Sequence, residues 1–194
     1  MENRSKKTKK MVYNGFIMAI IIIMSLVPFL GFIQVPPIAV TLVHIPVIIG
    51  AILLGFNSAL LFSLTFGLSS LFVALTRGST PLDVLFTNPM ISVVPRVIFG
   101  VAIIVIYNLV KKTSLKDGVK IGITAFLSSF FHSIIVITAL FIALGINDPT
   151  GVGSNLLTGI LAALFTVNVT LEAVVAAILT VPVVLASRKV LKGI

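Results

Sequence analysis

The sequence is built from long apolar segments that short polar stretches interrupt. An α-helix needs about 20 apolar residues to cross the hydrocarbon core of a bilayer. The segments that approach or exceed this length are residues 11–32, 39–55, 58–76, 90–110, 119–145 and 155–186. A helix satisfies its own backbone polar groups in lipid, whereas an irregular segment does not. We therefore predict an all-α membrane protein, a bundle of six transmembrane helices.

The composition excludes the main alternatives. Of the 194 residues, 58% are hydrophobic and 10% are charged, whereas soluble domains average about 45–50% apolar and about 25% charged residues. A soluble fold of this length has too little interior to hide so much apolar surface. Cysteine is absent and histidine occurs twice, so we expect no disulfide and no resident metal or cofactor. No phosphate-binding GxxxxGK[ST] loop is present, so the chain is not expected to hydrolyse ATP.

The basic residues predict the topology. All of the 14 Lys and Arg residues except Arg77 and Arg96 lie at the N-terminus, between the fourth and fifth apolar segments, or at the C-terminus. Under the positive-inside rule these three clusters mark the cytoplasmic face, and six spans place them on one side. We predict one integral membrane domain over 1–194, with a basic cytoplasmic tail (1–10), the bundle (11–187) and a basic cytoplasmic end (188–194).

The arrangement of basic and apolar segments also indicates what the chain interacts with and whether its first apolar segment is cleaved. The basic residues flank membrane segments instead of covering a soluble fold, so nucleic acid is not an expected partner. The lipid bilayer is the expected surrounding. The first apolar segment is longer than the apolar region of a signal peptide and no small-residue cleavage pattern follows it, so we interpret it as a retained span.

Ionisable residues inside the spans are few, and each is a candidate functional residue because lipid makes it costly. Arg96 either pairs with Glu172 to join two helices, or offers its guanidinium to a carboxylate or phosphate that enters from outside. His132, in the middle of the fifth span, either packs between helices or contacts a ligand. His44 precedes Ile45 and Pro46, and we expect it to satisfy a backbone group that the helix break frees.

Three uncharged residues complete the candidates. Asn168 lies four residues before Glu172 and therefore on the same helical face, where it either joins helices or contacts a ligand. Gly15 and Ala19 lie four residues apart in the first span, a spacing that lets another helix approach closely. That helix belongs either to this chain or to a separate membrane subunit.

Three stretches in this order carry a resemblance to a known family. They are residues 44–55 (HIPVIIGAILLG), 86–96 (FTNPMISVVPR) and 168–173 (NVTLEA). With the chain's size and six spans, they make the sequence similar to the substrate-binding S component of energy-coupling factor (ECF) vitamin transporters, and most similar to the pantothenate-type branch. The resemblance covers essentially the whole chain.

The resemblance implies a function in the plasma membrane of a bacterium. An S component captures a vitamin from outside, associates with a transmembrane coupling protein and two cytoplasmic ATPases, and topples in the membrane to release the vitamin inside. The substrate-binding residues it implies here are Arg96, Asn168, His132, Asn88 and Glu172. It also implies that the face bearing Gly15 and Ala19 docks to the coupling protein, although Ile23, one turn further, departs from the small-residue pattern.

Pantothenate agrees with the residue chemistry because it carries one carboxylate, and Arg96 is the cation available at that depth. A low-dielectric cavity strengthens such a charge-assisted pair. Another vitamin, such as cobalamin, remains an alternative within the same family. Two alternatives come from other classes: a small intramembrane enzyme that uses Glu172 and His132, although no HExxH or GxSxG motif supports it, and a purely structural membrane protein.

Overall fold

The computed structural model describes residues 2–27, 30–35, 38–78, 84–147 and 152–190. Within these ranges, nothing is described of the side chains at 2–5, 32–40, 141, 144–147 and 152–168. The helices are α1 (Glu2–Leu26), α2 (His44–Leu54), α3 (Phe56–Arg77), α5 (Pro89–Ser92), α6 (Val94–Lys111), α7 (Asp117–Asn147) and α8 (Val152–Val190). The strands are β1 (Phe32–Val35) and β2 (Ile38–Thr41).

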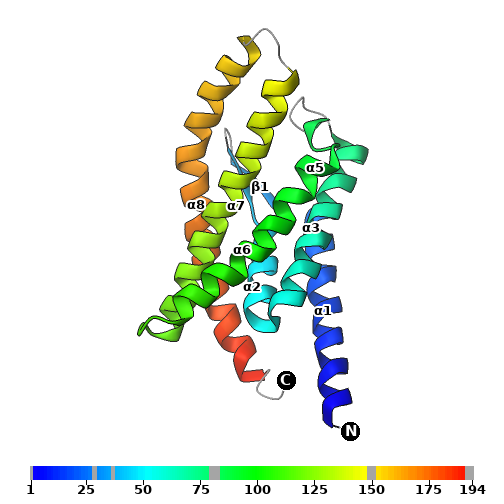
Figure 1. Cartoon of the computed structure of the whole chain (residues 1–194), viewed down its shortest axis with the longest axis vertical. Helices are drawn as coiled ribbons and strands as arrows, with labels where there is room; N and C mark the ends of the chain where they lie inside the picture. Colours follow the sequence, from blue (N-terminus) through cyan, green and yellow to red (C-terminus); the bar gives the residue numbers. More distant parts are fainter. Residues whose placement is uncertain (1, 28–29, 36–37, 79–83, 148–151, 191–194) are drawn as a thin grey trace.

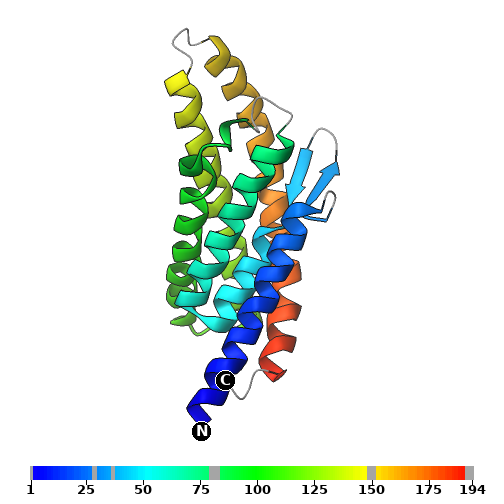
Figure 2. The same ribbon diagram turned by 90° about the vertical axis from the view of Figure 1, so that its right-hand side faces the viewer.

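The helices run up and down in one elongated bundle (Figure 1). Among the described residues, five helical segments are long and apolar enough to cross a membrane, with α5 and α6 counted together, and α2 is a shorter apolar helix. The start of α1, the link between α6 and α7, and the end of α8 lie toward the same end of the bundle (Figures 1 and 2). The prediction of membrane-crossing helices is thus confirmed for five spans.

The segment between α1 and α2 differs from the prediction. We expected the first span to continue to residue 32 and the second to begin at residue 39, with a turn or extended stretch at 33–37. Instead, α1 ends at Leu26 and α2 begins at His44. The expected extended backbone is present at 33–35 as part of β1, which forms an antiparallel hairpin with β2 in which Phe32 pairs with Thr41 and Val35 with Ile38. Both strands are rich in β-branched residues, which favour extended backbone. The described chain therefore adds one two-stranded ribbon to the helical bundle.

The start of the fourth span is interrupted at Val93, which separates α5 from α6. Asn88 caps α5, because its side-chain oxygen accepts a hydrogen bond from the amide of Met90 at 2.9 Å. Each of the two helices has a proline in its first turn, where the missing N–H has no intrahelical partner to lose. Arg96 consequently lies in the first turn of α6.

The main hydrophobic core lies around α2, where α1, α3, α6, α7 and α8 converge. Its largest fully buried apolar side chains include Phe62, Phe99 and Ile48. A side chain at Gly50 would collide with the ring of Phe62, and one at Gly100 would collide with the side chain of Ser63. These two glycines let α2 and α6 approach α3 closely.

Candidate functional site

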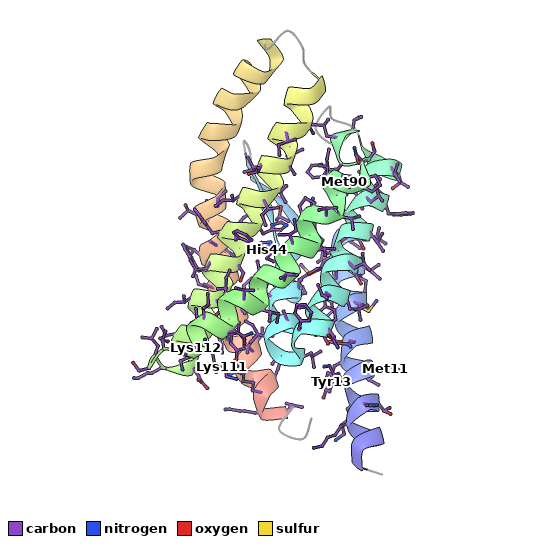
Figure 3. All side chains as sticks on the ribbon, in the orientation of Figure 1. Met11, Tyr13, His44, Met90, Lys111 and Lys112 are labelled. Carbon is purple, nitrogen blue, oxygen red and sulfur yellow. The ribbon has the colours of Figure 1, made fainter. Side chains whose placement is uncertain are left out.

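Several buried polar side chains lie near the start of α2, where helices from both halves of the chain meet. His44 begins α2 and is fully buried, and Figure 3 shows it at mid-height in the bundle. Arg96 on α6, His132 on α7 and Glu172 on α8 are each less than 10% exposed. The structure therefore brings most of the predicted ionisable candidates into one interior region.

Aromatic rings connect the two histidines to the arginine. The rings of His44 and His132 are stacked, with centroids 5.4 Å apart and an interplanar angle of 15°. Phe99 and Phe66 lie 4.7 and 5.6 Å from the His132 ring, centroid to centroid. The guanidinium carbon of Arg96 lies 5.6 Å from the centre of the Phe66 ring, within the range of a cation–π interaction.

Arg96 is 6% exposed, and the hydrogen bonds of its guanidinium are only partly satisfied. Its Nη1 donates a hydrogen bond to the backbone oxygen of Ile91 at 2.8 Å, and its carbon lies 5.0 Å from the centre of the Phe86 ring. Its Nε is buried without a hydrogen-bond partner. Among the described residues, no ion pair joins Arg96 to Glu172. The helix-joining pair proposed as an alternative for Arg96 is therefore not what the structure shows.

Glu172 is bound to other parts of its own chain. One carboxylate oxygen accepts a hydrogen bond from the backbone amide of Thr41 at 2.6 Å, and the other accepts one from the hydroxyl of Ser133 at 3.2 Å. These two bonds connect α8 to the end of β2 and to α7. The two hydrogen bonds of the Glu172 carboxylate therefore hold the β1–β2 hairpin against the helical bundle.

The buried serines of α7 belong to the same polar group. The hydroxyl of Ser129 lies 2.9 Å from Nε2 of His44, within hydrogen-bond distance. Nε2 of His132 is buried and has no hydrogen-bond partner. His44, which we expected to satisfy a backbone group, interacts with the backbone of Thr41 and is also in direct contact with His132 and Ser129.

Two predicted residues are not shown to be part of this buried group. Asn88 is exposed near the end of the bundle opposite to Lys111 and Lys112, as its neighbour Met90 shows in Figure 3. Its amide oxygen is already used to cap α5. Asn168 lies on α8, but its side chain is outside the described residues.

Sequence reasoning missed the rings and one backbone donor. Phe66, Phe86 and Phe99 are three of 14 phenylalanines, and nothing in their sequence context distinguishes them from residues that face lipid. The donor on Thr41 is its backbone amide. Every residue except proline carries such a group, so the sequence does not single it out. The closest signal was the run of serines around His132, which marked α7 as a polar helix face.

Comparison with known proteins decides the family. Residues 9–184 match the model of the ECF transporter substrate-specific component. The chain belongs to this family. It is 26% identical to the pantothenic acid transporter PanT of Lactococcus lactis subsp. cremoris, over 96% of both chains. It is 28% identical to the pantothenate transporter PanT of Leuconostoc mesenteroides subsp. mesenteroides, over 97% of this chain and 99% of the relative.

Membership of this family settles two broader questions. The family and both relatives are transporter components, so the intramembrane enzyme considered for Glu172 and His132 is set aside. Together with its apolar helices, membership identifies the chain as a multi-pass protein of the bacterial cell membrane.

The predicted docking face of this ECF component lies open on α1. Gly15 and Ala19 are both exposed, and a side chain built at Gly15 would meet no atom within 4 Å. The apolar neighbours Met11, Phe16 and Ile23 are 73%, 64% and 52% exposed. The described part of the chain therefore does not pack another helix against these small residues.

Proposed function

We propose that this ECF component captures pantothenate from outside the cell and passes it inward when it is coupled to a transmembrane protein and two cytoplasmic ATPases. Family membership supports the role of substrate capture. The substrate assignment is supported by two full-length relatives that are named as pantothenate transporters, and by the chemistry of the buried polar region.

The incompletely satisfied guanidinium of Arg96 is the observation that carries the substrate proposal. A buried charge without a counterion is costly, because desolvation of the ion is not repaid. The carboxylate of pantothenate supplies that counterion, and Nε of Arg96 is a buried donor still without a partner. An Arg–carboxylate pair in a dry site is a strong and directional contact.

The remaining groups of pantothenate are an amide and two hydroxyls, which need polar partners. His132 supports this assignment, because its Nε2 is buried and unpartnered beside the Arg96 region. We assign Asn168 and Glu172 to the same site, as the resemblance implies, and Asn88 to the exposed edge of that site. For Glu172, a contact with the substrate would be additional to its hydrogen bonds with Thr41 and Ser133.

We further propose six crossings in one domain over residues 1–194, with α2 as the short second span and both termini in the cytoplasm. The basic clusters support this orientation, because they lie toward the end of the bundle where α1 begins and α8 ends (Figure 1). The open face around Gly15 and Ala19 is then the docking surface for the coupling protein.

Calorimetry on the purified chain in detergent tests the substrate assignment. The chain is titrated with pantothenate and with cobalamin, without ATP or metal. We expect binding of pantothenate alone, and a loss of about 30-fold or more in affinity for Arg96→Ala, because truncation of one partner of a buried charge pair costs about 2–5 kcal/mol.

Arg77→Ala is the matched control for this experiment. Arg77 is exposed, and its Nη1 donates to the backbone oxygen of Leu26 at 2.5 Å, at the end of α1. We expect this variant to bind pantothenate as the unmodified chain does. Cobalamin binding without pantothenate binding would overturn the substrate, and equal binding by the Arg96 and Arg77 variants would overturn the role of Arg96.

A further inference from the structure

A groove of about 490 Å³ lies between the start of α1, the end of α2 and the end of α8. Its lining divides into two chemical kinds. The basic lining is Lys6, Lys7 and Lys10 of α1 and Arg188 of α8. The apolar lining is residues 52–54 at the end of α2. No acidic side chain lines the groove among the residues that the structure describes.

The arginine is held in place at the edge of this groove. Its Nη2 donates to the hydroxyl of Tyr107 at 2.5 Å, and its Nη1 lies 3.4 Å from a carboxylate oxygen of Asp117. Asp117 is exposed and offsets part of the arginine's charge. The lysines of α1 line the same groove, which therefore concentrates positive charge between two helices that are far apart in the sequence.

The position of the groove along α1 matters as much as its charge. Lys10 directly precedes Met11 and Val12, which are 73% and 64% exposed and begin the apolar surface of α1. A basic cleft that borders such a surface lies at the level of lipid headgroups, where Lys and Arg attract anionic lipids. A free phosphate would use the cations but would gain nothing from the apolar wall formed by α2.

We propose that this groove binds the headgroup of one anionic phospholipid. The phosphodiester lies between the lysines of α1 and the guanidinium of Arg188, and the acyl chains begin against the apolar wall formed by residues 52–54 of α2. A lipid bound in this way bridges α1 and α8. It therefore stabilises the position of α1, the helix that carries the open face around Gly15 and Ala19.

Thermal unfolding of the purified full chain in a zwitterionic detergent tests the proposal. Dioleoylphosphatidylglycerol is added in increasing amounts, with dioleoylphosphatidylcholine as the neutral lipid of matched chains. Lys7→Gln/Lys10→Gln removes two cations from the groove. Lys112→Gln/Lys116→Gln is the control, because it removes the same charge from exposed positions between α6 and α7 that do not line the groove.

We expect phosphatidylglycerol, and not phosphatidylcholine, to raise the melting temperature of the unmodified chain and of the control variant. The groove variant should need about 30-fold more phosphatidylglycerol for half of the effect, since each basic residue near the surface contributes about a factor of five. One phosphatidylglycerol retained per chain in native mass spectrometry would support the site directly.

Three results would overturn the proposal. If both variants respond equally, the attraction is a property of net charge and not of the groove. If inorganic phosphate at the same concentration gives the same rise, the ligand is a free anion and not a lipid. If phosphatidylglycerol leaves the unmodified chain unchanged, the groove holds no such lipid.

Discussion

The carboxylate of Glu172 on α8 accepts hydrogen bonds from the end of β2 and from α7. Its removal tests whether these bonds hold the β1–β2 hairpin against the helices. Glu172→Ala deletes the acceptor of the Thr41 amide at 2.6 Å and that of the Ser133 hydroxyl at 3.2 Å. A hydrogen bond to a charged group contributes about 1.5–3 kcal/mol. Loss of the first bond alone should therefore raise the rate of hydrogen exchange at the Thr41 amide by about 10- to 150-fold.

Hydrogen–deuterium exchange with mass spectrometry on the chain in detergent measures this effect. The neighbouring amide of Leu42 is an internal reference, because it donates to the backbone oxygen of Gly31 at 2.7 Å and not to Glu172. Ser133→Ala is the matched variant, since it removes the weaker bond and leaves the Thr41 contact intact. If Thr41 exchanges at the same rate in Glu172→Ala as in the unmodified chain, the carboxylate does not hold the hairpin.

Two further predictions concern the open face of α1 and the histidine pair. Gly15→Leu or Ala19→Leu adds a large side chain where the chain itself is open, so the purified protein should still bind vitamin while uptake by the assembled transporter in proteoliposomes is lost; loss of binding would mean that this face packs internally. Ser129→Ala removes the partner of His44 at 2.9 Å and should lower the free energy of unfolding by about 1 kcal/mol. If the Ser129→Ala variant melts at the same temperature as a Ser114→Ala control, the hydrogen bond between Ser129 and His44 does not stabilise the fold.

The sequence predicts the long spans well because hydropathy reports length and polarity, which are what a bilayer requires. α3 and α7 begin and end within two residues of the predicted segments. The hairpin escaped prediction because its apolar residues have the hydropathy of a membrane helix. Only the β-branched character of Ile33, Val35, Ile38 and Val40 and the intervening prolines distinguished it from a helical span.

The candidate site was predictable in its residue types but not in its pairings. Arg96, His132 and Glu172 were identified because ionisable groups in lipid are expensive. Which of them meet depends on how α6, α7 and α8 rotate about their axes, and that rotation is decided by packing over the whole bundle. The stacking of His44 on His132 joins residues 88 positions apart, and no local pattern encodes it.

The proposed contact between the buried guanidinium of Arg96 and the carboxylate of the vitamin is tested most directly by the alcohol analogue of pantothenate. In pantothenol a hydroxymethyl group replaces the carboxylate. We predict that the unmodified chain binds pantothenate about 100-fold or more tightly than pantothenol by calorimetry, and that Arg96→Gln nearly removes the difference. Equal affinities of the unmodified chain for the two compounds would contradict the central claim.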